Sequence, residues 1–171
     1  MDGVLADTES QYITWYYNTY GVKVSHDELI GKAEGDGFPD KTAVGKFLLT
    51  PGFFRSLPVM PGAVEAVGEL MKYFEIFIVS AAMEFPQSLS EKQEWLSHHF
   101  PFISWRNVVF CGDKSVIWAD YMIDDHQKNL AKFKGTPILF HAAHNTLIAD
   151  YQRVRSWKEV VGLLKTSEAI A

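Results

Sequence analysis

Cysteine, basic charge and long apolar runs are all scarce in this sequence. Cys111 is the only cysteine, so no disulfide can form within the chain, and a reducing cytoplasm is the expected location. The formal net charge is −5, and no basic stripe could neutralise a phosphate backbone, so a nucleic-acid polymer is not an expected partner. No apolar run approaches the roughly 18 to 20 residues of a membrane span, so no membrane partner is expected either.

The 171 residues are 47% hydrophobic and 14% aromatic, which suffices for one domain with a sizeable core and a small lid. Before Pro61 the signals are helical. Tyr12, Tyr16 and Tyr20 recur at helical spacing, and Gly21 is placed to end that helix. Two shorter helices are expected next, one opened by the capping-box pair Ser25 and Glu28, and one opened by Pro39 and ended by Pro51 and Gly52.

From Pro61 onward, helical segments alternate with apolar runs. This alternation predicts an α/β fold with a mostly parallel sheet and covering helices. A capping-box pair, Ser88 with Glu91, supports one of the helices. The expected helices are 61–72 and 88–99, and the expected strands are 74–80, 108–110, 121–123 and 137–140, the first of them buried on both faces.

Polar side chains follow the predicted strands where each strand ends. Ser80 ends one strand, Asp124 and Asp125 follow another, and Lys114 and Asp2 lie in loops beside them. Ligands of such sheets bind beyond the carboxyl ends of the strands, so these groups are expected to share one crevice. Paired carboxylates there call for a cation, and Mg²⁺ suits hard oxygen ligands and a phosphate.

The order of these motifs resembles the haloacid-dehalogenase phosphatases. Residues 2–7, Asp-Gly-Val-Leu-Ala-Asp, are similar to the first motif, Asp-x-Asp-Gly-Val-Leu-Ala-Asp, with Met1 in place of its first two positions. Ser80 matches the second motif, Lys114 the third, and the pair Asp124 and Asp125 the fourth. The 5'(3')-deoxyribonucleotidase branch (cytosolic 5'-nucleotidase type C) is indicated by residues 51–54, 61–63, 91–92 and 95, and the similarity runs from Met1 to about Asn145.

The resemblance implies a Rossmannoid parallel sheet flanked by helices, with a small helical cap. The core domain would comprise residues 1–8 and 59–171, and residues 9–58 would form the cap inserted after the first motif. The family's first central strand would be largely missing from these 171 residues, since it runs into the first motif.

The implied activity is that of a magnesium-dependent phosphomonoesterase. It would act as a 5'-nucleotidase on (deoxy)ribonucleoside monophosphates through a phosphoaspartyl intermediate. Asp2 would be the general acid and base, and Ser80 and Lys114 would bind the phosphate and stabilise its charge. The metal would be held by the nucleophile, the backbone carbonyl of Asp2 and Asp124, with Asp125 in support.

The nucleophilic aspartate of the family would stand two positions before Asp2, which is before Met1. We therefore expect Met1 to be an internal methionine of a longer natural chain. The 171 residues alone are expected to show little or no turnover.

Substrate contacts are expected from Ser80, Lys92 and Lys114 at the phosphate, and from aromatic side chains at the base. The chain carries Thr8 where relatives commonly have an aromatic, and Ala81 with Ala82 where they have a hydroxyl and a proline, which leaves base specificity open. The aromatic candidates are Trp15, Phe38 and Phe53.

Two other functions stay open: a non-catalytic module that binds a phosphorylated ligand, and a phosphatase of another small phosphorylated metabolite. The oligomeric state is also open, with a homodimer among the options. A zinc site is not expected, because no histidine pair on one predicted helix has the i, i+4 spacing of metalloproteases. Packing or surface roles are expected instead for His98, His99, His126, His141 and His144.

Overall fold

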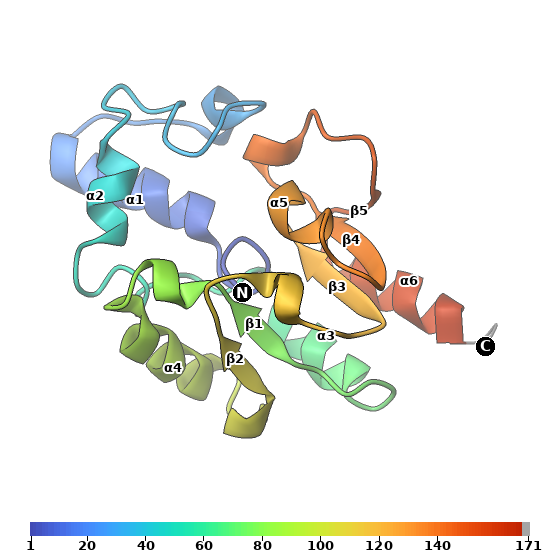
Figure 1. The fold of residues 1–171 in the computed structure, drawn as a ribbon. Helices are drawn as coiled ribbons and strands as arrows, with labels where there is room; N and C mark the ends of the chain where they lie inside the picture. The colour runs from blue at the N-terminus through green and yellow to red at the C-terminus, as the bar shows by residue number, and fades with distance from the viewer. Residues whose placement is uncertain (169–171) are drawn as a thin grey trace.

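The computed structural model describes residues 1–168, with side chains through residue 166 (Figure 1). The first helix, α1 (Thr8–Tyr20), begins after Asp7, whose carboxylate accepts hydrogen bonds from the Ser10 amide at 3.0 Å and the Ser10 hydroxyl at 2.7 Å. It ends at Gly21, where φ is 70°, a conformation that glycine adopts at little cost. The predicted first helix and its stop signal are confirmed.

The next two helices are shorter than expected. The Ser25 and Glu28 capping box is present, but the helix that it opens is a single 3₁₀ turn, η1 (His26–Leu29). The prediction that Pro39 opens the following helix is wrong, because α2 spans Ala43–Leu48. The Asp40 carboxylate accepts hydrogen bonds from the Thr42 amide and hydroxyl, at 2.9 and 2.6 Å, and this side-chain turn delays the helix.

After Pro61, helices and strands alternate as predicted. The helices are α3 (Ala63–Leu70), α4 (Ser88–His99), α5 (Gln127–Leu130) and α6 (Trp157–Glu168). Single 3₁₀ turns are η2 (Ala82–Glu84), η3 (Trp105–Asn107), η4 (Lys114–Val116) and η5 (Ala143–Asn145). The strands are β1 (Ile78–Ser80), β2 (Val108–Phe110), β3 (Tyr121–Asp124), β4 (Thr136–Phe140) and β5 (Gln152–Val154).

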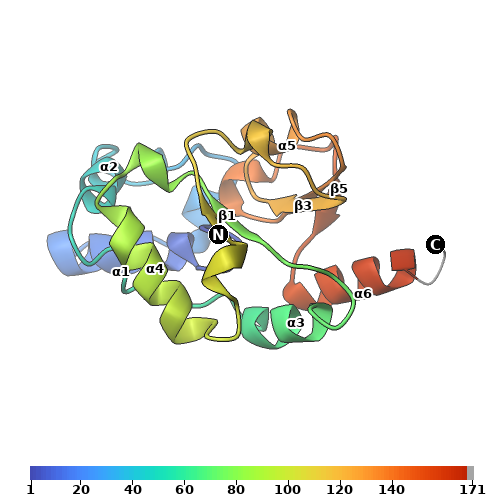
Figure 2. The ribbon, with the colours of Figure 1, turned by 60° about the horizontal axis from the view of Figure 1, so that its bottom comes forward.

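The strands form two parallel sheets, β1–β2 and β3–β4–β5. Helices α3 and α6 lie side by side, and Figure 2 shows them together below the strands. Parallel strands flanked by helices confirm the α/β, haloacid-dehalogenase-like fold class. Within residues 1–168, no helix has both the length and the apolar character needed to cross a membrane.

The strand expected over residues 74–80 is wrong in length and burial. Only Ile78–Ser80 pair with a neighbour, Val108–Phe110, and Phe77 is 47% exposed. Among the described residues, the other edge of β1 has no strand beside it, and a cavity of about 390 Å³ separates β1 from β3. An apolar run can extend as a strand only where a ladder partner accepts its backbone hydrogen bonds.

The segment 1–8 is packed into the main core. Val4 and Leu5 are each 4% exposed, and the Trp157 indole donates to the Val4 carbonyl at 2.8 Å. The Met60 amide donates to the Leu5 carbonyl at 2.7 Å, and the Asp7 amide donates to the Pro58 carbonyl at 2.8 Å. These bonds join the start of the chain to α6 and to the residues just before α3. The division into a core and a cap over 9–58 stays a prediction.

The predicted capping box of Ser88 with Glu91 is wrong. Ser88 lies inside α4, and its hydroxyl donates to the Ala82 carbonyl at 3.4 Å. The Glu91 carboxylate instead accepts backbone hydrogen bonds from residues 52, 54 and 55, at 2.5, 3.1 and 3.2 Å. Three amides from another part of the chain outcompete one local amide for the carboxylate. Glu91 therefore anchors the 52–55 turn to α4.

Candidate active site

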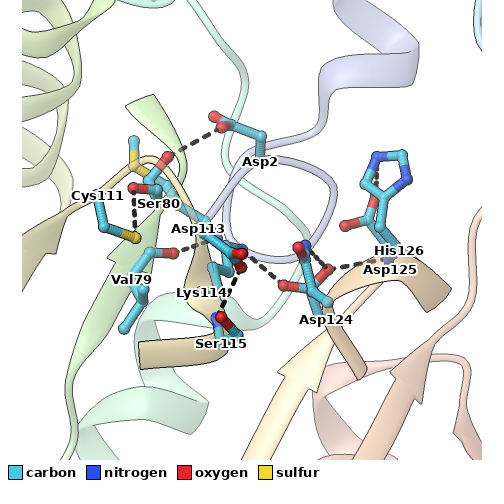
Figure 3. Close-up of polar contacts among 12 residues, drawn as sticks. Asp2, Val79, Ser80, Cys111, Asp113, Lys114, Ser115, Asp124, Asp125 and His126 are labelled. Atoms are coloured by element: carbon cyan, nitrogen blue, oxygen red, sulfur yellow. Dashed lines mark hydrogen bonds and ion pairs between the residues drawn. The ribbon is translucent and has the colours of Figure 1, made fainter. Parts of the chain in front are cut away.

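Asp2, Ser80 and Lys92 meet at the carboxyl end of β1. The Lys92 ammonium lies 2.6 Å from Asp2 Oδ2 and 3.2 Å from Ser80 Oγ. The Ser80 hydroxyl donates to Asp2 Oδ2 at 3.3 Å (Figure 3). Burial acts to raise the pKa of Asp2, but the charge and hydrogen bond of Lys92, together with the charges of the Met1 ammonium and Lys114, outweigh it and the pKa is lowered. Asp2 Oδ1 is buried and has no hydrogen-bond partner among the described residues.

Lys114 and Asp124 form a second ion pair, which is buried between η4 and the end of β3. Lys114 Nζ lies 2.6 Å from Asp124 Oδ2, and their side chains are 10% and 3% exposed. Asp124 Oδ1 accepts hydrogen bonds from the His126 amide and the Asn129 side chain, both at 2.9 Å. Burial alone would raise the pKa of Asp124, but the charges of Lys114 and the Met1 ammonium, together with the hydrogen bonds from Lys114 and Asn129, hold it below its usual value. Both oxygens of this carboxylate are therefore already satisfied by the protein.

Asp125 points to the other side of the loop. Figure 3 shows Asp124 directed toward Lys114 and Asp125 directed toward the His126 ring. The Asp125 side chain is 5% exposed, and its carboxylate accepts no hydrogen bond from the described residues. Burial raises its pKa to about 6. A buried carboxylate without donors is costly unless a proton or a cation neutralises it.

Gly3 makes room for the Asp125 carboxylate. Its φ is 67°, and a Cβ at this position would overlap the Asp125 carboxyl group. Both the backbone conformation and the contact therefore require glycine. The Asp2–Gly3 peptide and the end of β3 are thereby brought together, as the expected convergence of the first and fourth motifs requires.

Two histidines lie beside Asp125, which sequence reasoning missed. Asp125 Oδ2 is 3.7 Å from His126 Nε2 and 3.7 Å from His144 Nε2, and the two rings stack with centroids 4.5 Å apart. Glu34 Oε1 is 3.8 Å from His126 Nε2. His126 and His144 follow the neighbouring parallel strands β3 and β4, so they meet across the sheet edge and not along a helix. That strand-end placement was the signal available in the sequence.

Two of the aromatic candidates, Trp15 and Phe53, pack on each other, whereas Phe38 lies elsewhere. The Phe53 ring is fully buried, with Tyr12 at 5.4 Å and Trp15 at 5.1 Å between ring centroids. Trp15 also packs on Phe47. Phe38 lines a cavity of about 340 Å³ next to Gly3, Asp125 and His144. Of the three predicted aromatics, Phe38 alone is found in the lining of this cavity.

One wall of this cavity is tied to the core through Ala143. The Gly31 amide donates to the Ala143 carbonyl at 2.9 Å, and the Ala143 amide donates to Glu9 Oε2 at 3.2 Å. Glu9 Oε1 lies 2.5 Å from His26 Nδ1. The segment around η1 is thus held against the loop that follows β4.

Comparison with known proteins shows the family of this chain. The family model described as "5' nucleotidase, deoxy (Pyrimidine), cytosolic type C protein" matches residues 1–169. The chain belongs to this family. Membership implies the haloacid-dehalogenase superfamily, so the resemblance predicted from the motifs is confirmed.

Relatives of the 5'-nucleotidase type C family match nearly the whole chain. A Bacillus subtilis strain 168 protein, named 5'(3')-deoxyribonucleotidase, is 39% identical over 160 residues, which cover 94% of this chain and 92% of the relative. A Staphylococcus aureus strain Mu50 protein, given that name provisionally, is 41% identical over 161 residues, covering 94% of this chain and 89% of the relative.

Proposed function

We propose that this protein is a phosphatase of deoxyribonucleoside monophosphates that depends on Mg²⁺. The observation that carries the proposal is the meeting of the four motifs at the ends of β1 and β3, with two lysine ammonium groups beside three carboxylates. Ammonium groups stabilise the charge of a phosphate, and carboxylates hold the cation that phosphate requires. The names of the relatives support the substrate class.

Asp125 and the Asp2–Gly3 peptide fit a metal better than Asp124 does. Asp124 already accepts three donors, whereas the buried Asp125 carboxylate accepts none. A bound Mg²⁺ would supply charge neutralisation for the phosphate. In this arrangement Asp124 orients Lys114, which faces the phosphate, and Ser80 and Lys92 bind it from the β1 side.

The proposed chemistry is attack of an aspartate on phosphorus, with Asp2 protonating the leaving alcohol. In the first motif of the family, that aspartate stands two positions before the residue matched by Asp2. Lys92 opposes the acid role of Asp2 in the resting state because it lowers the carboxyl pKa. A phosphate group that draws Lys92 away would let Asp2 take up a proton.

A non-catalytic phosphate-binding module is the second candidate. The short Lys92–Asp2 contact favours it, since it keeps Asp2 ionised and occupied. This candidate predicts tight binding of nucleotides without release of phosphate.

An N-terminally extended variant separates the two candidates. An apolar strand ending in Asp is added directly before Met1, and a matched variant ends in Asn. Under the first candidate, only the Asp form releases phosphate from deoxyribonucleoside monophosphates, and only with Mg²⁺. Binding by both forms with no release from either would overturn the enzymatic proposal.

A substrate panel tests the substrate class with the same active extension. Deoxyribonucleoside 5'- and 3'-monophosphates are compared with ribonucleotides and with sugar phosphates of similar charge. Equal rates on sugar phosphates would show that the cavity does not recognise a nucleoside. In the same extended variant, Asp125→Asn is expected to reduce the Mg²⁺-dependent release of phosphate more than Asp124→Asn does.

A further inference from the structure

Thr8 and Tyr12 lie one turn apart on the same face of α1, and both line the cavity of about 340 Å³. Their exposed fractions are 7% and 6%, so each residue is more than nine-tenths buried. Gly3, Phe38 and Asp125 line the same cavity. The two hydroxyl-bearing side chains therefore lie beside the proposed phosphate and metal site.

The hydroxyl groups of Thr8 and Tyr12 have no hydrogen-bond partner among the described residues. Asp2 Oδ1 is the only side-chain oxygen or nitrogen of the described residues that is both unpaired and fully enclosed. The two hydroxyl oxygens are therefore in contact with open space, which is the cavity. Water can satisfy them in the unliganded protein, and a ligand that displaces this water must replace the lost hydrogen bonds.

The directions of both side chains are fixed by their surroundings. The Tyr12 ring stacks on the Phe53 ring, with centroids 5.4 Å apart and planes 18° apart. The Asp7 carboxylate caps α1 by accepting a hydrogen bond from the Ser10 amide at 3.0 Å, which holds the turn that carries Thr8. Hydroxyl groups held in place before binding can discriminate between ligands, because little freedom is lost when the ligand enters.

The charges around Tyr12 select an uncharged partner for its hydroxyl group. Burial raises the pKa of Tyr12 well above its usual value, so the hydroxyl keeps its proton and can donate. The negative charges of Glu34, Asp2 and Asp125 act in the same direction. The same carboxylates repel a second anion, so an uncharged polar group suits this position better than a phosphate does.

The proposed phosphate-binding groups lie outside this cavity. Ser80, Lys92 and Lys114 are absent from its lining. The nucleoside is the uncharged part of the proposed substrate, and its base and sugar both carry hydrogen-bonding groups. Phe38 adds an aromatic side chain to the lining, of the kind on which a base can stack.

Taking the proposed function as given, we propose that Thr8 and Tyr12 bind the nucleoside part of a nucleoside monophosphate through hydrogen bonds and determine which nucleosides are accepted. A site that hydrogen-bonds its ligand strongly rejects an analogue without the matching groups, because the buried hydroxyls are then left unpaired. Thr8 and Tyr12 are therefore specificity-determining residues that act on the ligand and not on the reacting phosphorus.

Calorimetric titration of the full chain in the presence of Mg²⁺ tests this assignment. The probes are thymidine and deoxyguanosine 5'-monophosphates, 2-deoxyribose 5-phosphate and inorganic phosphate. Tyr12→Phe keeps the ring and Thr8→Val keeps the branched shape, and each removes one hydroxyl. Each variant is expected to bind at least one nucleotide about three- to tenfold more weakly and to bind inorganic phosphate as the parent does. A matching loss for the sugar phosphate would place the contact on the sugar, and an unchanged value would place it on the base.

Tyr17→Phe and Thr14→Val are the matched controls. Each removes an exposed hydroxyl from the same helix, outside the lining of the cavity. Both are expected to bind every probe with the affinity of the parent.

Stability without ligand separates recognition from a structural role. A hydroxyl without a protein partner contributes little to folding, so Tyr12→Phe and Thr8→Val are expected to keep the urea midpoint of the parent. The rise of this midpoint on adding nucleotide is expected to be smaller in both variants.

Two outcomes would overturn the assignment, and they differ in what they say about the proposed function. Nucleotide affinities equal to that of the parent in folded Tyr12→Phe and Thr8→Val would exclude these two residues and leave the proposed function standing. A parent that binds both nucleotides no more tightly than inorganic phosphate would overturn the nucleoside specificity of the proposed function as well.

Discussion

Two neighbouring carboxylates of the site, Asp124 on the lysine side and Asp125 on the histidine side, have opposite environments. Asp124 is buried with a lysine and two further donors, whereas Asp125 is buried against glycine and two imidazoles that do not bond to it. The first carboxylate is compensated from within the protein. The second, Asp125, has no such partner and is available to a cation that binds from solution. Adjacent residues of one motif thus divide into a structural member and a ligand-binding member.

The largest expected effect comes from breaking the compensated pair. Lys114→Met removes the ammonium and leaves Asp124 charged and 3% exposed. Removing one partner of a buried ion pair costs about 3 to 5 kcal/mol in the free energy of unfolding. Urea denaturation at neutral pH measures the loss.

Lys132→Met is the control for this experiment. Lys132 pairs with Asp113 at 3.4 Å, but both side chains are more than half exposed. Exposed pairs contribute little, so its unfolding free energy should match that of the parent. Similar losses in both variants would show that burial of Asp124 is not what makes Lys114 important.

The second-largest expected effect is an increase in the free energy of unfolding when Asp125 is replaced, and this increase depends on pH. The pKa of Asp125 rises from its ordinary 3.8 to about 6 on folding, because burial disfavours the charged form. The folded state therefore holds its proton more tightly, and stability is lost as pH rises from about 4 to about 6. A shift of this size corresponds to about 3 kcal/mol above pH 6.

Asp125→Asn removes this penalty. Without metal, the variant is expected to match the parent near pH 4 and to exceed its unfolding free energy by up to about 3 kcal/mol at pH 7. Denaturation at several pH values in the presence of a chelator measures the difference. A variant that is less stable than the parent at pH 7 would mean that Asp125 is compensated within the protein after all.

The smallest effect tests a single donor to Asp124. Asn129→Ala removes the hydrogen bond to Oδ1 but leaves Lys114 and the His126 amide in place. A hydrogen bond to a charged group contributes about 1.5 kcal/mol at the lower end of its range. The cost should therefore fall well below that of Lys114→Met, and a larger cost would place the main compensation of Asp124 on Asn129.

The sequence predicted the convergence of the motifs but not the directions of the side chains. Ser80, Asp124 and Asp125 could be placed because parallel strands end at a common edge. The opposite orientations of Asp124 and Asp125 depend on Lys114, ten residues away, and on the space above Gly3. Local patterns carry no information about such contacts.

Long-range partners also explain the errors in secondary structure. Glu91 matches a capping box, yet three amides of the 52–55 turn bind its carboxylate. The run 74–80 is apolar, yet only its last three residues find a strand partner. In contrast, α1 was predictable because Asp7 and Gly21 fix its ends through contacts within one turn.

The tie at Ala143 has a kinetic consequence. Because the Gly31 amide and the Ala143 amide are both bonded across one side of the cavity, any widening of the cavity on this side requires these two bonds to break. Hydrogen exchange at the two amides would then report the frequency of opening. A bound nucleotide would slow exchange at both positions together. The exchange rates of these two amides would therefore report whether the cavity is occupied.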